Sequence, residues 1–405
     1  MRGSLLLALC LFVSPAVVAA QPWVFDESIA VTQVQGGKIF HHLESSGRHN
    51  IAVSGTTVAV AWEDDRDGTP RIYLARKETR AAGFGDDVRI SGNDEAYEPS
   101  LAALSAGRFV VAWEEAGQVL ARIAGPRTLG PVLRLSQKEG GQPSLVVDGN
   151  QIIAVWSERG DGLGRIRLAR LHVAEDSGLS AHGSCFVDPP PAQDEQLYPS
   201  AAVVDGDAVV VWEDRRLGHT VIMAAVGKSG SQCEFSSPQR ISEQPNRAKS
   251  PYGKGHGVAR ATLASYGRSG LLVAWADKRD YRHGYDIYGA HYSGTSSFGP
   301  NVRIQDDFGE LARQWHASAA GDRAGRVVVA WTDEREGNAD VVLSWSENDR
   351  WSDDTPVPPA SGPGEQSHPS IVLAEQGDLH IVWVERDSKD APTRLRYAQG
   401  RAPAN

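Results

Sequence analysis

The chain has 405 residues, of which 41% are hydrophobic and 23% are charged, a balance that excludes a disordered chain and a protein with many membrane spans. Its formal net charge of −10 gives no overall attraction to nucleic acid or to anionic lipid, so we expect neither as a partner. The 42 glycines, 22 prolines and 11 tryptophans indicate many turns and strands and few helices.

Residues 1–20 have the pattern of a secretory signal peptide. Arg2 is followed by a short apolar run, and Val18 and Ala20 supply the small residues that a signal peptidase requires. We therefore expect cleavage after Ala20 and export to the periplasm or the cell exterior. No other apolar stretch approaches the roughly eighteen residues of a spanning helix, so no membrane span is expected in residues 21–405.

Two cysteines, Cys185 and Cys233, lie beyond the signal peptide. In an oxidising compartment an isolated pair of cysteines is typical of one disulfide, and we predict that bond here. The alternative interpretation is a pair of separate buried thiols.

A repeat runs through the chain after the signal peptide. Seven tryptophans each close a short apolar run that is rich in β-branched residues: Trp62, Trp113, Trp156, Trp212, Trp275, Trp331 and Trp383. The first and the last are 321 residues apart over six steps, a mean of about 53, which fits a four-stranded propeller blade with its loops. The repeat predicts an all-β fold, a seven-bladed β-propeller of four-stranded blades.

Turn residues divide each unit into four strands. The inner strand opens about thirteen residues before the tryptophan at a Pro-Ser pair such as Pro99-Ser100, and the tryptophan ends the second strand. A third run, such as 71–75, and a more polar outer run, such as 88–91, complete the blade. The seventh unit lacks an outer run, and residues 25–32 match the outer pattern. We therefore expect this N-terminal strand to complete the last blade and to close residues 21–405 into a single domain.

The full phrase of each unit is Pro-Ser, apolar strand, Gly turn, apolar strand, Trp-x-Asp-x-Arg, Gly, and a strand ending in Ala-Arg. This phrase resembles the blades of secreted bacterial sialidase-like (BNR-type) β-propellers, and the resemblance covers essentially all of residues 21–405. It implies the propeller fold; the family includes glycosidases, lectin-like binders and many proteins without known activity. Intact Asp boxes are absent, and the segment 350–354 is at most a remnant of one.

A carboxylate stands two residues after each blade tryptophan, and an arginine follows in six of the seven units. We expect these pairs to be structural, because an Asp at a turn caps backbone N–H groups while its Arg bridges to a neighbour and stacks on an aromatic ring. The alternative is a ring of ion pairs that binds ligands. The clearest pairs are Asp64 with Arg66, Asp214 with Arg216, Asp277 with Arg279 and Asp333 with Arg335.

The residue just before the Pro-Ser position differs from blade to blade and is expected to face the mouth of the central channel. These candidate ligand-binding residues, with one neighbouring tryptophan, are Arg48, Glu98, Gln142, Tyr198, Arg260, Trp315, His316 and His368. Arginines, histidines, a tyrosine and a glutamate around one opening can bind a carboxylate or sulfate and supply acid or base groups. The alternative is a polar channel mouth that holds ordered water.

The sialidase resemblance would recruit Tyr198 and Glu98, with His316 or His368, as candidate catalytic groups beside an anion clamp of two arginines, Arg48 and Arg260. Seven units instead of six, and the lack of a Phe/Tyr-Arg-Ile-Pro motif, argue against that chemistry. Histidines 41, 42 and 49 match no established metal-ligand spacing, and no glycine-rich phosphate loop occurs, so neither metal nor cofactor is expected.

Two hypotheses remain from the sequence. The first, which we favour, is a non-catalytic secreted or periplasmic propeller that binds a glycan, a peptide or a partner protein at the channel mouth. The second is a glycan-active enzyme, a glycoside hydrolase or lyase, that uses the same residues.

Overall fold

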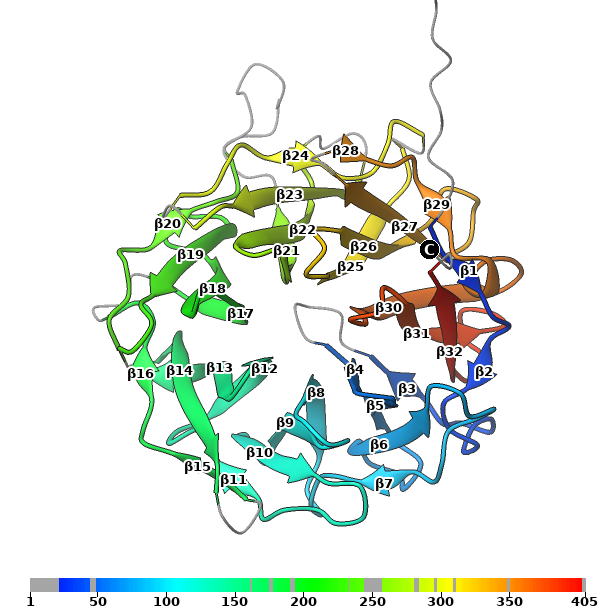
Figure 1. Cartoon of the computed structure of the whole chain (residues 1–405), viewed down its shortest axis with the longest axis horizontal. Helices are drawn as coiled ribbons and strands as arrows, with labels where there is room; N and C mark the ends of the chain where they lie inside the picture. Colours follow the sequence, from blue (N-terminus) through cyan, green and yellow to red (C-terminus); the bar gives the residue numbers. More distant parts are fainter. Residues whose placement is uncertain are drawn as a thin grey trace, which may run out of the picture.

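The computed structural model describes residues 22–43, 49–160, 162–174, 178–189, 194–231, 233–243, 257–279, 284–294, 297–308, 311–347 and 350–402. These residues form seven antiparallel sheets arranged in a ring around a central channel, with one short 3₁₀ helix, η1 (Pro358–Ala360) (Figure 1). The all-β, seven-bladed propeller predicted from the repeat is confirmed. The predicted signal peptide lies outside the described residues. None of the helices within them could span a bilayer.

The innermost strands of the blades line the channel. They are β4 (Ile51–Ser54) with the short β3 (His41–His42), β8 (Ala96–Ala103), β12 (Gly140–Asp148), β17 (Gln196–Val204), β21 (Val258–Tyr266), β25 (Gln314–Gly321) and β30 (Glu365–Leu373). The second strands, which carry the tryptophans, are β5 (Thr57–Asp64), β9 (Phe109–Glu115), β13 (Gln151–Gly160), β18 (Asp207–Asp214), β22 (Gly270–Asp277), β26 (Val327–Asp333) and β31 (Leu379–Arg386).

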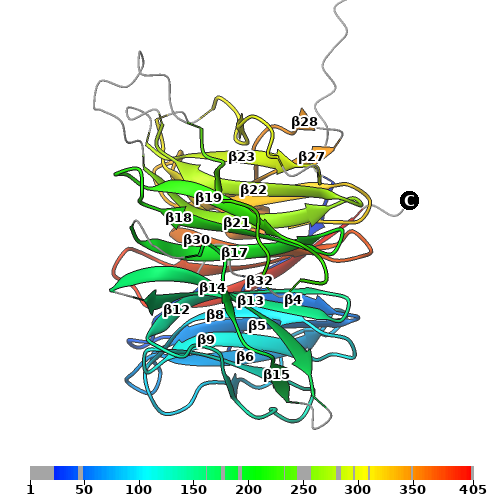
Figure 2. The ribbon, with the colours of Figure 1, turned by 90° about the vertical axis from the view of Figure 1, so that its left-hand side faces the viewer.

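The third and fourth strands form the outer part of each blade (Figure 2). The third strands are β6 (Arg71–Glu78), β10 (Gln118–Ala124), β14 (Leu163–Val173), β19 (Val221–Gly227), β23 (Asp286–Tyr292), β27 (Asp340–Glu347) and β32 (Arg394–Arg401). The outer strands are short: β7 (Val88–Arg89), β11 (Leu133–Arg134), β15 (Leu179–Ala181) with β16 (Cys185–Phe186), β20 (Gln239–Arg240), β24 (Val302–Arg303), β28 (Arg350–Trp351) with β29 (Thr355–Pro356), and β1 (Val24–Phe25) with β2 (Ile29–Ala30).

The N-terminal strands close the ring as predicted. β1 and β2 both pair with β32, so that Phe25 lies opposite Gly400 and Ile29 lies opposite Tyr397. A side chain at position 400 would clash here, because an added Cβ would come within 2.9 Å of both Phe25 and Trp23. The last blade therefore takes its three inner strands from the end of the chain and its outer strand from the beginning.

The hydrophobic core consists of layers between the blades. Each of the seven clusters of buried apolar side chains lies between two neighbouring blades and contains one of the blade tryptophans. All seven indoles are fully buried. Replacing a buried tryptophan by alanine typically lowers the free energy of unfolding by about 3–5 kcal/mol, so the stability of each layer depends strongly on its indole.

The serine of the Pro-Ser pair joins neighbouring blades at the channel. The Ser100 hydroxyl accepts the backbone N–H of Leu145 in the next blade at 3.0 Å, and Ser318 accepts that of Ile371 at 3.1 Å. Ser370 of the last blade accepts the N–H of Asn50 in the first blade at 3.0 Å. The inner strands would otherwise expose unpaired amides to one another, so this contact satisfies them and sets the spacing of the blades.

Replacement of Ser318 by alanine is expected to destabilise the protein by roughly 1–3 kcal/mol, because the buried Ile371 N–H loses its acceptor. Equilibrium denaturant unfolding of purified protein measures this loss. Ser388→Ala, at an exposed loop position, is the matched control and should leave the midpoint unchanged. Equal midpoints for both variants would show that the inter-blade contact contributes nothing.

The two cysteines lie on adjacent blades, Cys185 on β16 and Cys233 in the loop after β19. No S–S bond joins them in this structure. Burial raises the pKa of the Cys185 thiol to about 12, and the neighbouring Cys233 adds to the shift through a hydrogen bond and its charge. The two sulfur atoms are thus direct neighbours, and the disulfide stays a prediction.

Under oxidising conditions we expect Cys185 and Cys233 to form a disulfide that staples the third blade to the fourth. Peptide mass spectrometry of unreduced protein should recover one cross-linked peptide pair. Complete alkylation of both thiols in protein purified from an oxidising compartment would refute the bond.

Candidate functional site

The six described residues predicted to face the channel mouth share an unusual backbone. Each lies within its inner strand at a bulge, where the register against the second strand shifts between the residue directly before it and the second residue after it, as from Leu197 to Ser200 around Tyr198. The strands thus begin three or four residues earlier than the Pro-Ser position predicts. All six residues have a left-handed φ: Glu98 (54°), Gln142 (58°), Tyr198 (49°), Arg260 (59°), His316 (53°) and His368 (53°).

Left-handed φ at residues other than glycine costs free energy and persists where the surroundings enforce it. At four of the six positions an enforcing contact comes from the residue directly after the tryptophan of the preceding blade. Glu213 accepts the backbone N–H of Arg260 at 2.9 Å, and Thr332 accepts that of His368 at 3.0 Å. The same arrangement joins Glu63 to the N–H of Glu98 and Glu114 to that of Gln142.

These anchoring residues were missed in the sequence analysis. The position after the tryptophan is Glu in three blades, Thr or Ser in two, and apolar in two, so a polar preference is visible in the repeat. The sequence does not show, however, that the side chain reaches across to the next blade. The seventh predicted mouth residue, Arg48, lies outside the described residues.

The mouth residues, several of which contact one another, form what we call the belt: Glu98, Gln142, Tyr198, Arg260, His316 and His368, with Trp315 and His42 beside them. The guanidinium of Arg260 lies 3.2 Å from the centre of the Tyr198 ring, a close cation–π contact. The Gln142 side-chain oxygen accepts the Tyr198 backbone N–H at 2.8 Å.

The other side of the belt is a stack of rings. His316 lies between Trp315 and His368, with ring centres 4.4 Å and 3.7 Å away. His42 of the first blade adds a tilted contact to His368 at 5.8 Å and lies 3.9 Å from a Glu63 oxygen. The stack therefore continues from the sixth blade through the seventh to the first.

The stacked position determines the charge of His316. Burial, together with the charges of Arg260 and His42, lowers the pKa of His316 to about 3. The ring is thus neutral at physiological pH. Its Nδ1 atom and the Trp315 Nε1 atom are buried and have no hydrogen-bond partner among the described residues.

The predicted anion clamp of Arg48 and Arg260 stays a prediction, because Arg48 lies outside the described residues. Arg260 is stacked on Tyr198, and carboxylates of Glu63, Glu114 and Glu213 surround the belt through its backbone contacts. No hydrogen bond joins the Tyr198 hydroxyl to a carboxylate of the described residues. A tyrosine nucleophile would require such a base beside it. No group of three or more potential metal ligands occurs among the described residues.

A cavity of about 310 Å³ occupies the channel below the belt. It is lined by the inner strands of all seven blades, mainly by alanine, valine and leucine, with His49 at the end nearer the belt. Burial lowers the pKa of His49, so it too is neutral. The chemically varied groups are thus concentrated at the mouth, whereas the channel wall is apolar.

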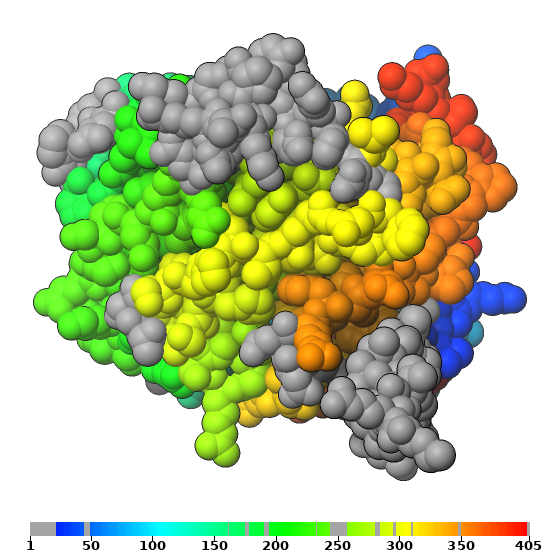
Figure 3. Space-filling model, turned by 90° about the horizontal axis from the view of Figure 1, so that it is seen from above, coloured from blue at the N-terminus to red at the C-terminus, as the bar shows by residue number. Residues whose placement is uncertain are grey.

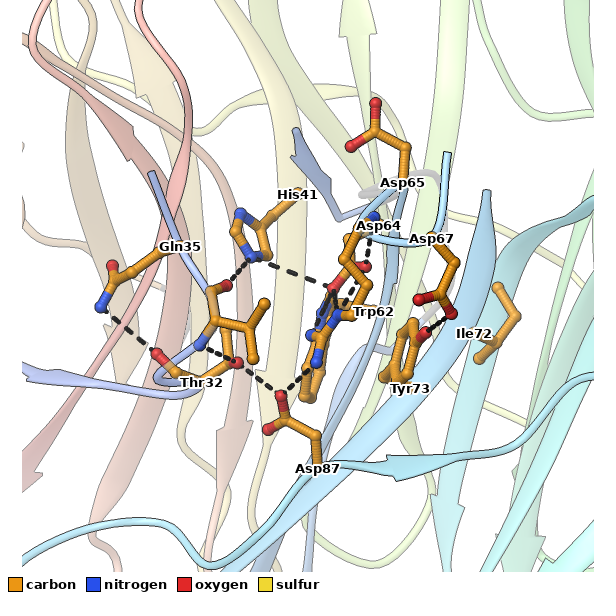
Figure 4. Close-up of polar contacts among 12 residues, drawn as sticks. Thr32, Gln35, His41, Trp62, Asp64, Asp65, Asp67, Ile72, Tyr73 and Asp87 are labelled. Atoms are coloured by element: carbon orange, nitrogen blue, oxygen red, sulfur yellow. Dashed lines mark hydrogen bonds and ion pairs between the residues drawn. The ribbon is translucent and has the colours of Figure 1, made fainter. Parts of the chain in front are cut away.

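The Trp-x-Asp-x-Arg segments lie within the blades, and Figure 4 shows that of the first blade, with Trp62 and Asp64 beside Tyr73 and Asp87. The Trp62 Nε1–H donates to Asp64 at 2.8 Å, and the second oxygen of that carboxylate accepts the Arg66 backbone N–H at 3.2 Å. The Arg66 guanidinium lies 3.9 Å from the Tyr73 ring centre and pairs with Asp87 at 2.6 Å.

The equivalent contacts recur with Asp214 and Arg216, with Asp277 and Arg279, and with Asp333 and Arg335. These carboxylates have side chains that are at most 1% exposed, so a ligand cannot reach them. Arg216 bridges to Asp188 of the preceding blade, while Arg66, Arg279 and Arg335 contact the outer part of their own blades. The geometry is that of internal cross-links.

No protein-family model matches the chain, and no curated protein matches it. Among solved structures, it is similar to a protein of unknown function from Dyadobacter fermentans, with 9% identity, a TM-score of 0.57 and coverage of 94% of this chain and 99% of that one. A puromycin-hydrolyzing peptidase from Mycobacterium tuberculosis has 12% identity and a TM-score of 0.50 over 91% of this chain and 56% of its own.

An α-L-arabinofuranosidase from Fusarium graminearum aligns with 12% identity and a TM-score of 0.48 over 75% of this chain and 92% of its own. At such identities the neighbours show the propeller fold alone. They do not establish the sialidase-like family or an activity.

Acid should weaken the fold through His316. Unfolded histidine takes up a proton near pH 6.5, whereas folded His316 stays neutral down to about pH 3, so the unfolded state binds more protons at pH 5. The stability present above pH 6.5 is therefore lost as the pH falls, by about 2 kcal/mol at pH 5. The variant His316→Gln should lack this pH-dependent loss of stability. Gln142 at the equivalent position shows that glutamine can adopt the left-handed backbone conformation.

The measurement is the free energy of unfolding of both proteins between pH 7.5 and 4.5. The wild type should lose more stability on acidification than the variant. Parallel pH profiles would show that His316 binds protons equally in both states.

Proposed function

We propose that this protein is a secreted or periplasmic binding propeller that takes its ligand at the belt and catalyses no reaction. The observation that carries the proposal is the set of six left-handed bulges, which hold six residues of five types around one mouth. Other polar features recur with little variation: a carboxylate two residues after every blade tryptophan, and a serine or threonine contact between several neighbouring blades. Strained backbone maintained at one position in six blades, with five different types of side chain among them, is typical of a functional site.

The chemistry of the belt favours a glycan among the possible ligands, ahead of a peptide or a partner protein. Both faces of the His316 ring are covered by neighbours, and Arg260 covers one face of Tyr198, so a ligand meets ring edges and polar groups. Glu98 supplies an acceptor, Arg260 a donor, and Gln142 both. Sugar hydroxyl groups both donate and accept, and therefore match such a mixed ring.

The arrangement of Tyr198 is the reason for proposing binding over catalysis. Its ring packs under a guanidinium, and its hydroxyl lacks the carboxylate partner that would activate it within the described residues. The sialidase-like origin of the blades stays part of this proposal, as does export by the N-terminal signal. A glycan-active enzyme is the alternative that the experiment must be able to reveal.

The test is a glycan array and a panel of fluorogenic glycosides applied to purified protein. We expect binding without turnover, and a loss of affinity of at least roughly tenfold in Arg260→Gln, which removes the charged donor from the belt. The matched control is Arg268→Gln, an exposed arginine in the turn after the same strand β21. It should bind like the wild type.

Two results would contradict the proposal. Glycan binding that Arg260→Gln and Gln142→Ala both leave intact would place the ligand elsewhere. Turnover of a glycoside that Tyr198→Phe abolishes would establish the enzyme.

A further inference from the structure

The fifth and sixth blades are joined at their outer strands by two aspartates. Asp306 follows β24 of the fifth blade, and Asp354 directly precedes β29 of the sixth. The Asp306 backbone N–H donates to the Asp354 carboxylate at 3.0 Å, and the Asp354 N–H donates to the Asp306 carboxylate at 3.1 Å. The two outer parts lie side by side on the wall of the ring, the fifth blade in yellow and the sixth in orange (Figure 3).

A single arginine faces this pair. The Arg335 guanidinium contacts Asp354, lies 2.8 Å from Asp333 and reaches Asp306 at 3.7 Å. The side chains of Asp354 and Asp333 are 1% and 0% exposed, and that of Asp306 is 18% exposed. Three carboxylates thus share one positive charge in a place that water hardly reaches, where like charges repel strongly.

The neighbouring seam, between the fourth and fifth blades, has the same geometry with one carboxylate fewer. Glu243 and Asn301 exchange backbone contacts at 2.8 Å and 3.0 Å. Arg279 donates to the Asn301 oxygen at 2.9 Å and pairs with Asp277 at 2.6 Å. Asn301 therefore stands where Asp354 stands in the next seam. The Asn301 side-chain amide therefore makes the contacts of this position without carrying a charge.

We propose that the seam between the fifth and sixth blades is a pH-sensitive clasp, which is tight while the carboxylate cluster holds one proton and weaker once that proton leaves. The groups that face Asp354 are Arg335 and Asp333 of its own blade and Asp306 of the preceding one. Loss of the proton leaves three negative charges around one guanidinium.

The electrostatics of Asp354 agree with this geometry. Burial raises the pKa of Asp354 to about 7, against the opposing effect of Arg335 and the Asp306 N–H, and the Asp306 charge raises it further. An unfolded aspartate ionises near pH 3.9. Between these values the folded protein holds a proton that the unfolded chain releases. The stability from this proton is therefore fully present below about pH 4 and is lost as the pH rises to about 7.

The position of the clasp connects it to the belt. The chain that leaves the clasp at Asp306 leads into β25, which carries Trp315 and His316. No ligand is needed for the clasp to operate, so it stands independently of the proposed binding function.

The test compares Asp354→Asn with the wild type by thermal unfolding from pH 5 to pH 9. Asn301 shows that an amide fits the geometry, so the variant should fold. Its melting temperature relative to wild type should rise by roughly 2–4 °C between pH 5 and pH 8, because only the wild type loses the proton. The reverse change, Asn301→Asp, should create the same alkaline loss in the neighbouring seam.

Asp353→Asn is the matched control, an exposed carboxylate beside the clasp, and should leave the pH profile unaltered. A difference between Asp354→Asn and wild type that stays constant from pH 5 to pH 9 would overturn the clasp. So would an Asn301→Asp variant whose pH profile matches that of the wild type.

Discussion

The structure depends on the hydrogen bond that six of the seven buried indole N–H groups donate to the carboxylate two residues later. Packing a tryptophan between two blades fills the layer, but its N–H must find an acceptor there. Six of the seven blades use the carboxylate at this position. A buried carboxylate in turn requires a positive partner, and the Asp blades supply the arginine that ties the second strand to the outer edge. The need for one hydrogen-bond acceptor thus explains why a carboxylate, and often an arginine, follows the tryptophan in the blades.

The repeat was sufficient to predict the fold because each repeated tryptophan fills one hydrophobic layer between two blades. The spacing of the tryptophans predicted the number of blades, and the outer-strand pattern of residues 25–32 predicted the closure of the ring. The predicted start of the inner strands was wrong by three or four residues. A Pro-Ser pair looks like a strand boundary, whereas here the strand passes through it by way of a bulge in the left-handed conformation. A residue such as Glu98 or Tyr198 gives no local signal of that backbone.

The sequence predicted which residues lie near one another at the mouth, but it did not predict which side chains contact one another. Alignment to the tryptophan placed six described residues at one mouth, but the stacking of Arg260 on Tyr198 depends on side-chain conformations that the sequence does not contain. The anchoring role of Glu213 and the pairing of Asp306 with Asp354 each join different blades. Such contacts follow from how neighbouring blades meet, and a repeat pattern describes only one blade at a time.

Closure by a two-residue strand also determines how the ring responds to force. Val24 and Phe25 pair with Arg401 and Gly400, so the first and last described strands run antiparallel with their free ends at the same edge. Tension applied between the two ends would open these backbone hydrogen bonds one after another, as a zipper, instead of loading them together in shear. The seventh blade is consequently the mechanical weak point of the ring, although it contains a full hydrophobic layer on both sides.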